Sequence, residues 1–201
     1  MISDPQNNFL VRFMSSKRVL TLWNDDGENP QDTSVLRKKS VELPVPLDKE
    51  SREIIQTLID SFMERDDASG LAAPQIGINK RVIVFRAKGF DEGQKKIKNI
   101  KDIEVLVNPR INQERGEKVS MAEGCLSCPD VQVEVSRFPE IKVRALDAKG
   151  EKINKRYLDF VARVIQHEID HLDGKLIVDY GDIYYPKSKQ LFFEKIFNDT
   201  R

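Results

Sequence analysis

The heptapeptide QHEIDHL, residues 166–172, contains both histidines of this 201-residue chain, His167 and His171. On an α-helix, a spacing of four residues corresponds to about 400° of rotation, so the two imidazole rings project from nearly the same face. Two rings placed in this way can bind one metal ion, and Glu168 lies close enough to reach a water on that ion without being a ligand. The heptapeptide therefore predicts a metal-binding helix.

Apolar residues around the heptapeptide indicate that this helix is buried. Two apolar stripes run along residues 159–172, and Gly174 follows as a candidate C-terminal cap. A chance pattern on a core helix is the plain alternative. Two histidines in 201 residues fall four apart about once in a hundred random sequences, and the added glutamate lowers this to about one in a thousand. We therefore favour the metal site.

A third ligand is expected, because two histidines do not hold a catalytic metal ion alone. A later carboxylate or one of the two cysteines could supply it, and Cys125 in EGCLSCP (123–129) is the better candidate. Gly124 lets backbone approach closely there, and a thiolate beside a metal ion is deprotonated. Cys128 is interpreted as a small buried hydrophobic residue.

A closed structural zinc site is the alternative, with Cys125, Cys128 and the two histidines as its four ligands. Residues three apart in extended backbone point to opposite faces, so the two cysteines would diverge. The glycine-rich knuckle usual for paired cysteine ligands is missing, and a closed site has no use for Glu168. These features favour an open, catalytic site.

The remaining pattern predicts an α+β fold, because strands surround one central helix instead of alternating with many. Asp48 is expected to cap a helix whose apolar stripe continues to residue 63, and a C-terminal helix is expected at residues 188–197. A hairpin turn is expected at residues 147–150. The expected strands are residues 18–23, 81–86, 103–108, 131–136, 141–146, 153–158 and 176–179.

Length and charge suit one globular domain with an attached arm. Residues 1–34, with a dense run of turn formers at residues 24–32, are predicted to be an irregular arm of unknown role, with the catalytic domain at residues 35–201. Lysine plus arginine and aspartate plus glutamate number 33 each. This balance gives no reason to expect nucleic acid or an anionic membrane as a specific partner.

Cellular location is predicted from the scarcity of cysteine. Two cysteines three positions apart cannot form a secreted disulfide framework, which favours a reducing compartment and a cytoplasmic protein. The N-terminus lacks the apolar segment of a secretory signal. Arg12, Lys17 and Arg18 leave organellar targeting as an alternative.

Three segments together resemble the motifs of the peptide deformylase family. They are GLAAPQ (70–75), EGCLS (123–127) and QHEIDHL (166–172), in the family's order and at similar spacing. The resemblance covers roughly residues 35–179. It implies a mixed fold in which the motif helix packs against antiparallel sheets, with the metal between helix and strand. The implied substrates are N-formyl-methionyl nascent peptides, with transient proximity to the ribosome.

The resemblance implies that Cys125, His167 and His171 bind one divalent ion, natively Fe(II), which Zn(II) or Ni(II) often replaces. It also implies that Gln75 and the backbone N–H of Leu126 hold the formyl oxygen. These roles make chemical sense, because a metal ion lowers the pKa of its water toward neutrality and Glu168 can pass the proton to the leaving amine. The residues expected beside the substrate are Ser69, Gly70 and Gly124, and those expected to orient the ligands are Glu123 and Gln166.

The chain departs from the family pattern at three positions near the substrate. Ala68 stands where many members have a glycine, and Ser69 replaces a usually aliphatic residue. Gln132 occupies a position that is often an arginine in contact with the substrate backbone. These changes leave the chemistry intact and bear on substrate affinity and side-chain preference.

Two other functions compete with deformylation. A zinc metallopeptidase shares the HExxH logic, but not the cysteine ligand or the Gln75 loop. A metal-stabilised binding protein without turnover would be expected to have lost Glu168 or Gln75, and both are present. The deformylase interpretation is therefore preferred.

Overall fold

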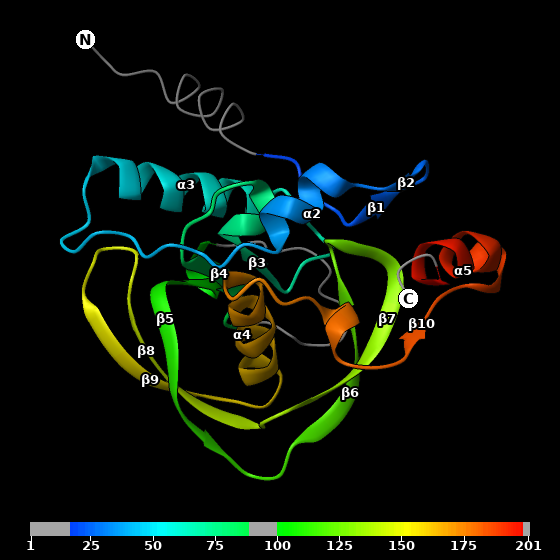
Figure 1. The fold of residues 1–201 in the computed structure, drawn as a ribbon. Coiled ribbons are helices and arrows are strands. Elements are labelled where there is room, and N and C mark those ends of the chain that lie inside the picture. The colour runs from blue at the N-terminus through cyan, green and yellow to red at the C-terminus, as the bar shows by residue number, and fades with distance from the viewer. Residues whose placement is uncertain (1–16, 89–99, 199–201) are drawn as a thin grey trace.

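Helix α4, Asp159–Leu172, lies at the centre of the computed structural model, with strands on both sides of it (Figure 1). The structure describes residues 17–88 and 100–198. Its mixed architecture confirms the predicted α+β fold with antiparallel sheets around the HExxH helix. Helix α5, Gln190–Asn198, confirms the predicted C-terminal helix.

A five-stranded antiparallel sheet has the order β3-β4-β5-β8-β9, and α4 packs against it mainly at β3, β4 and β9. Ile83 and Phe85 of this sheet pack with Ile165 and Leu172 of the helix, all fully buried. This packing holds the motif helix in place. The strands are β3 (Gly70–Ala72), β4 (Val82–Arg86), β5 (Ile103–Arg115), β8 (Glu140–Leu146) and β9 (Lys152–Leu158).

Strand β5 is longer than the predicted 103–108, because its polar second half pairs with β8. The register shifts between Val107 and Arg110 and again between Ile111 and Gln113. Such bulges bend a strand, and Figure 1 shows β5 curving below α4. The apolar pattern therefore predicted only the first half of β5, which lies in the core. The second half is a strand because it pairs with β8.

A three-stranded antiparallel sheet lies on the other side of α4, with the order β10-β7-β6. Strand β6 was not expected as a whole, because most of its residues are exposed and carry no apolar alternation. It pairs with β7 through a hairpin that ends at Cys125 and Cys128. The bounds are β6 (Val119–Cys125), β7 (Cys128–Arg137) and β10 (Ile183–Tyr184).

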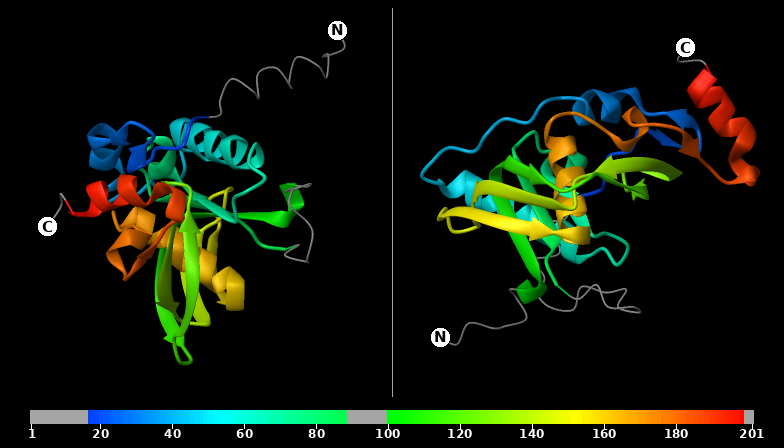
Figure 2. Two further views of the ribbon diagram at one scale, coloured as in Figure 1. Left: turned by 90° about the vertical axis from the view of Figure 1, so that its right-hand side faces the viewer. Right: turned by 90° about the horizontal axis from the view of Figure 1, so that it is seen from below.

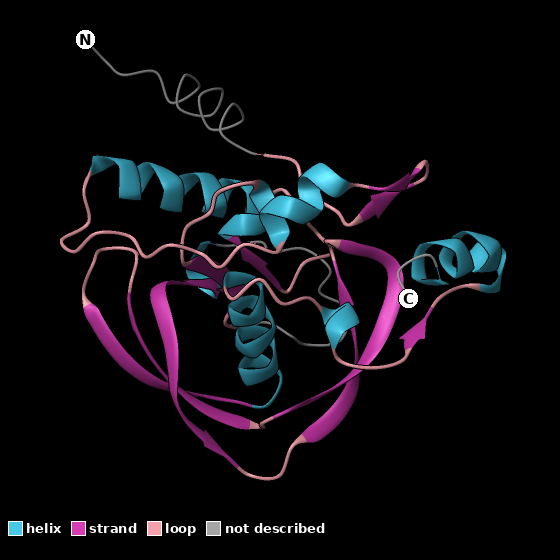
Figure 3. Cartoon of the chain, in the orientation of Figure 1, coloured by secondary structure: helices cyan, strands magenta, loops and turns pink. Residues whose placement is uncertain are grey.

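The predicted helix signals are confirmed at two ends. Helix α3 spans Lys49–Met63, and the Asp48 carboxylate accepts the Ser51 N–H at 2.8 Å as its N-terminal cap. Gly174 has φ +73° just after α4, and a Cβ there would lie 2.4 Å from the Arg37 carbonyl oxygen. Only glycine satisfies both conditions. Figure 3 shows α3 and α4 on different sides of β3 and β4, two strands of the five-stranded sheet.

One predicted strand is wrong. Residues 176–179 contain the 3-10 turn η3, Ile177–Asp179, in place of an extended segment. The Asp179 carboxylate accepts the Leu176 N–H at 2.9 Å, which closes the turn. The further 3-10 turns are η1 (Ala73–Ile76), η2 (Ile100–Asp102) and η4 (Lys187–Lys189).

The N-terminal region is more regular than its turn-rich sequence predicted. The strand expected at 18–23 is reduced to β1, Trp23–Asn24, which pairs with β2, Gly27–Glu28, and the helix α2, Pro30–Leu36, follows. Figure 2 shows β1–β2 beside α5 from the other end of the chain, and the Trp23 and Phe193 ring centroids are 5.6 Å apart. Residues 1–16 of the predicted arm lie outside the described residues, and the boundary at residue 34 stays a prediction.

No helix within residues 17–88 or 100–198 is both long enough and apolar enough to cross a membrane.

Candidate active site

Three side chains of the types that hold metal ions converge where the end of β6 faces α4. One donor atom from each of Cys125, His167 and His171 lies within 4.8 Å of the other two. Cys125 Sγ is 3.3 Å from His171 Nε2, and the two imidazole centroids are 5.1 Å apart. A thiolate with two imidazoles suits a divalent transition-metal ion and leaves a position open. The described residues therefore fit a single metal ion.

Cys128 lies outside this group. It is 1% exposed and packs in the apolar core beneath the three-stranded sheet, as the sequence interpretation expected. The reason given for its divergence was wrong, because the two cysteines face each other across the β6–β7 turn and do not share one extended run. A hydrogen bond from Cys128 lowers the pKa of the Cys125 thiol, against the opposing effect of burial.

Glu123 fixes the orientation of His167. Its Oε2 lies 3.0 Å from His167 Nδ1, which leaves His167 Nε2 to face the donor group. Burial alone would raise the pKa of Glu123, but hydrogen bonds with His167 and Arg137 lower it to about 2. Glu123 is therefore a carboxylate that holds the ring in one tautomer.

Two buried arginines complete this arrangement, and the sequence analysis assigned neither to the site. Arg137 contacts Glu123 at 2.7 and 2.8 Å and Asp170 at 2.7 Å, while Arg163 contacts Glu123 at 2.6 Å. Two guanidinium groups thus face two carboxylates, which balances the buried charge. A signal for Arg137 existed in the sequence, because it continues the inward-facing alternation of Val131, Val133 and Val135.

Gln166 was expected to orient a ligand, and the structure gives it other partners. Its amide nitrogen donates to the carbonyls of Phe138 and Ala162 at 2.8 and 3.0 Å, and its oxygen accepts the Phe138 N–H at 3.1 Å. These bonds tie α4 to the turn between β7 and β8. Gln166 therefore positions the helix as a whole.

Glu168 is 4% exposed, and its Oε2 has no hydrogen-bond partner in the described part of the chain. Burial raises the pKa of this carboxyl to about 7, although the neighbouring His167 and His171 oppose the shift. A buried carboxylate oxygen without a partner is costly in a folded protein. Its position beside the three donors indicates that the site is built for a further polar group.

Gly70 makes room for Glu168. A Cβ on Gly70 would lie 2.5 Å from Glu168 Oε1 and 2.9 Å from its Cδ. Glycine is thus required here because the Glu168 carboxylate comes so close. The backbone conformation itself is one that other residues could adopt. Sequence reasoning placed Gly70 beside the substrate, and the structure adds its contact with the carboxylate.

Gln75 is 2% exposed and lies between β3 and the metal-binding turn. Its Oε1 accepts the Ala72 N–H at 2.9 Å, which directs Nε2 toward Cys125 Sγ at 3.9 Å and Ser127 Oγ at 3.2 Å. The Leu126 N–H, in the same turn, donates no hydrogen bond to any described residue. Two N–H donors are thus available beside the three metal-binding side chains.

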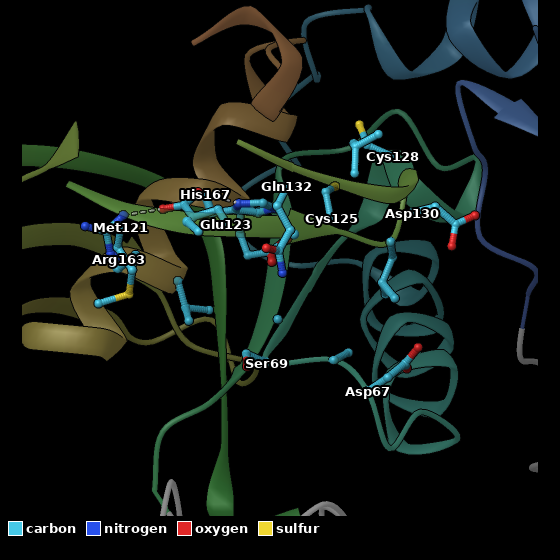
Figure 4. A pocket seen from close by; sticks show the side chains of 18 of the residues that line it. Asp67, Ser69, Met121, Glu123, Cys125, Cys128, Asp130, Gln132, Arg163 and His167 are labelled. Carbon is cyan, nitrogen blue, oxygen red and sulfur yellow. Dashed lines mark hydrogen bonds and ion pairs between the residues drawn. The ribbon is translucent and has the colours of Figure 1, made fainter. Parts of the chain in front are cut away.

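A cavity of about 780 Å³ opens over these groups. Met121, Phe160 and Val164 supply apolar side chains to its lining, and Ser69 and Gly124 also border it. Figure 4 shows Met121 and Arg163 on one side of the cavity and Ser69 and Asp67 on another. All three departures from the family pattern line this cavity, namely Ala68, Ser69 and Gln132.

Two histidines on an HExxH helix and a cysteine from β6, with a buried glutamate and N–H donors beside them, define a metal-dependent hydrolase. Comparison with known proteins then specifies the family. The family described as polypeptide deformylase matches residues 28–184. The chain belongs to the polypeptide deformylase family, whose members remove the N-formyl group from new polypeptides.

Individual relatives agree with this assignment. The peptide deformylase of Rickettsia prowazekii is 40% identical over 149 residues, which cover 71% of this chain and 82% of the relative. The peptide deformylase of Pseudothermotoga lettingae is 39% identical over 145 residues, covering 72% and 76%. A solved structure of a probable peptide deformylase from Synechococcus phage S-SSM7 is 38% identical with a TM-score of 0.65, covering 82% and 99%. That from Synechococcus elongatus, in complex with actinonin, is 30% identical with a TM-score of 0.67, covering 90% and 85%.

Proposed function

We propose that the chain hydrolyses the formyl amide of N-terminal formyl-methionine, with Cys125, His167 and His171 as metal ligands and Glu168 as the proton-transferring group. The observation that carries this assignment is the buried Glu168 carboxylate, which has a partnerless oxygen beside a complete donor set. A closed zinc site would leave that carboxylate without a purpose. Hydrolysis gives formate and a free α-amine.

The metal we propose is one Fe(II), with Zn(II) or Ni(II) as functional substitutes. When bound, the ion lowers the pKa of a water molecule toward neutrality and polarises the formyl carbonyl. The Cys125 thiolate gives the site one soft ligand, which suits all three metals. Glu123 keeps His167 Nδ1 protonated, so that Nε2 is free to act as the ligand.

Glu168 takes a proton from the attacking water and delivers it to the leaving nitrogen. The partnerless Oε2 offers the acceptor, and Gly70, which has no Cβ, leaves room for the carboxylate in this position. Such proton transfer contributes about 10²- to 10⁴-fold to rate. No other described acidic side chain combines burial with a free oxygen at the donor group.

Gln75 Nε2 and the Leu126 N–H stabilise the negative charge that develops on the formyl oxygen. Both donors border the turn between β6 and β7. Neither donates a hydrogen bond to a backbone carbonyl of a described residue. Removing one donor of this kind typically costs about 10²- to 10³-fold in kcat. Because Gln75 is fixed through Oε1 to Ala72, little reorganisation is needed during the reaction.

The methionine side chain fits the apolar lining of the cavity, against Met121, Phe160 and Val164. The peptide backbone would run along Ser69, Gly70 and Gly124, where side chains are small or absent. Gln132 lies on β7 between Gly124 of β6 and Tyr184 of β10, so its neutral amide faces the downstream part of the peptide. We propose that this part is held by hydrogen bonds without an arginine.

Nascent polypeptides are the proposed source of substrate, which places the enzyme transiently near the ribosome. The reducing compartment indicated by its two unpaired cysteines fits a cytoplasmic location.

Formate release from a formyl-methionyl peptide tests the proposal directly. The Fe(II)-loaded protein, purified without oxygen, should release one formate for each free α-amine formed, and should leave an unformylated casein substrate uncut. Casein cleavage without formate release would identify an endopeptidase instead. A protein that binds one metal ion and releases no formate would contradict the assignment.

Gly70→Ala should leave the fold intact and lower kcat by about 10²-fold, because the new Cβ displaces the Glu168 carboxylate. The measurement is kcat for formate release at equal metal content, with the melting temperature as a check on folding. Gly181→Ala is the matched control, since its Cβ would lie an ordinary 3.5 Å from the Glu134 carbonyl. Equal kcat in both variants would show that the position of Glu168 does not limit the reaction.

A further inference from the structure

A segment from the N-terminal region bonds to two loops of the active site. It comprises residues 17–23 and is called the strap below. The Leu20 N–H donates to the Gln75 carbonyl at 2.7 Å, and the Leu22 N–H donates to the Ser127 carbonyl at 2.9 Å. The strap thus bonds to both loops that carry the proposed oxyanion donors.

The strap bonds to different partners at successive residues. Residues 20 and 22 donate their N–H groups to the two active-site loops, while the intervening Thr21 N–H donates to the buried Asp32 carboxylate at 3.1 Å. Leu20 and Leu22 are both 8% exposed. Two loops separated by 52 residues in sequence are therefore both held by strap residues that lie only two positions apart.

Independent anchors hold the strap itself in position. Its first described residue, Lys17, donates its backbone N–H to Ser61 Oγ at 3.0 Å, and Trp23 Nε1 donates to the Pro129 carbonyl at 3.1 Å. Arg18 forms two bonds of 2.7 Å with Asp32, a residue of α2 that is 7% exposed. A segment fixed at both ends and in the middle can transmit a defined geometry to what it contacts.

Gln75 is the point at which this geometry reaches the chemistry. The strap holds its backbone carbonyl, the Ala72 N–H holds its Oε1, and only Nε2 remains directed toward Cys125 and Ser127. Ser127 is fully buried and is held by Leu22 through its own carbonyl. A shift of about 1 Å in a reacting group can cost about 10²-fold in rate.

We propose that the strap is a positioning element for deformylation, which sets the separation of the Gln75 and Leu126 donors through the Leu20 and Leu22 N–H groups. The inference rests on the proposed function, because it requires those donors to bind the developing oxyanion. It assigns a role to part of the N-terminal region. The residues of the strap do not contact the reacting atoms and act through Gln75 and Ser127.

A double-mutant cycle in the full-length, Fe(II)-loaded protein tests this role. Leu20→Pro removes one strap N–H, and we expect kcat for formate release to fall about tenfold while KM changes less than twofold. In the Gln75→Ala background the same proline should change kcat by less than twofold, because the donor it positions is gone. A purely structural role predicts the same factor in both backgrounds, and that result would overturn the proposal.

Two further variants keep the test specific. Val19→Pro places a proline in the same strap at an N–H that makes no hydrogen bond within the described residues, and it should retain kcat within twofold. If Leu20→Pro fails to fold, replacement of leucine 20 by its α-hydroxy analogue removes the N–H alone and should give the same tenfold loss. A normal kcat in the α-hydroxy variant contradicts the strap inference while leaving the proposed function intact. A normal kcat in Gln75→Ala contradicts the donor assignment itself.

Discussion

Glu168→Ala is expected to retain one metal ion per chain and to lose about 10³- to 10⁴-fold in kcat for formate release. The three proposed ligands are separate side chains, so the metal should remain, whereas Glu123, the other carboxylate beside them, is already held by His167 and two arginines. Glu168 is buried without a partner for Oε2, so its removal also relieves an unfavourable group. The variant should therefore unfold at the same or a higher temperature than the parent.

Metal content, melting temperature and kcat measured on one preparation separate these effects. Glu151→Ala, an exposed carboxylate in the β8–β9 turn, is the matched control and should keep full activity. Near-parental kcat in Glu168→Ala would rule out proton transfer by this residue. Loss of the metal together with activity would show that Glu168 acts on the ligands instead.

Cys125→Ser should weaken metal binding more than the roughly 10- to 100-fold typical of an outer-shell partner, because it removes a thiolate ligand. Cys128→Ala should keep the metal and lose stability, since Cys128 is buried among apolar residues and removing its sulfur leaves a small cavity. The two cysteines lie opposite each other at the end of one hairpin. Comparing the two variants therefore separates the loss of a ligand from a change in local folding.

The rate at which a chelator removes the metal is the direct measurement for this pair. Fast loss from Cys125→Ser alone is the expected pattern. Fast loss from both variants would give Cys128 a place in the metal site and revive the closed four-ligand arrangement. Fast loss from Cys128→Ala alone would reverse the ligand assignment.

Around these ligands, the chain uses a balanced cluster of buried charge. Glu123 and Asp170 are matched by Arg137 and Arg163, and every member is hydrogen-bonded. Removal of one member would leave an uncompensated charge in a low-dielectric environment. The cluster joins α4 to both strands of the β6–β7 hairpin, so that the ligands from helix and strand are held at a fixed separation.

Much of the site was determined by local sequence. The spacing of His167 and His171 fixes their common face on any α-helix, and the apolar stripes fix which way that helix is buried. The Asp48 cap depends on neighbouring backbone alone, and so does the left-handed conformation that favours glycine at position 174. For this reason the two main helices and the two histidines' shared direction could be predicted from the printed sequence.

Only the tertiary structure decided which distant residues serve those histidines. Strand register and chain reversal decide the exposed strand β6 and the turn that separates Cys125 from Cys128. They also decide the bonds from Arg137 and Arg163 to Glu123, and those from the strap to Gln75 and Ser127. Backbone N–H groups are the same in every residue except proline, so a sequence does not record which carbonyl they reach. The sequence by itself determined the metal-binding helix and its chemistry, and the fold decided the partners, because hydrogen-bond choice between remote segments is set by packing in three dimensions.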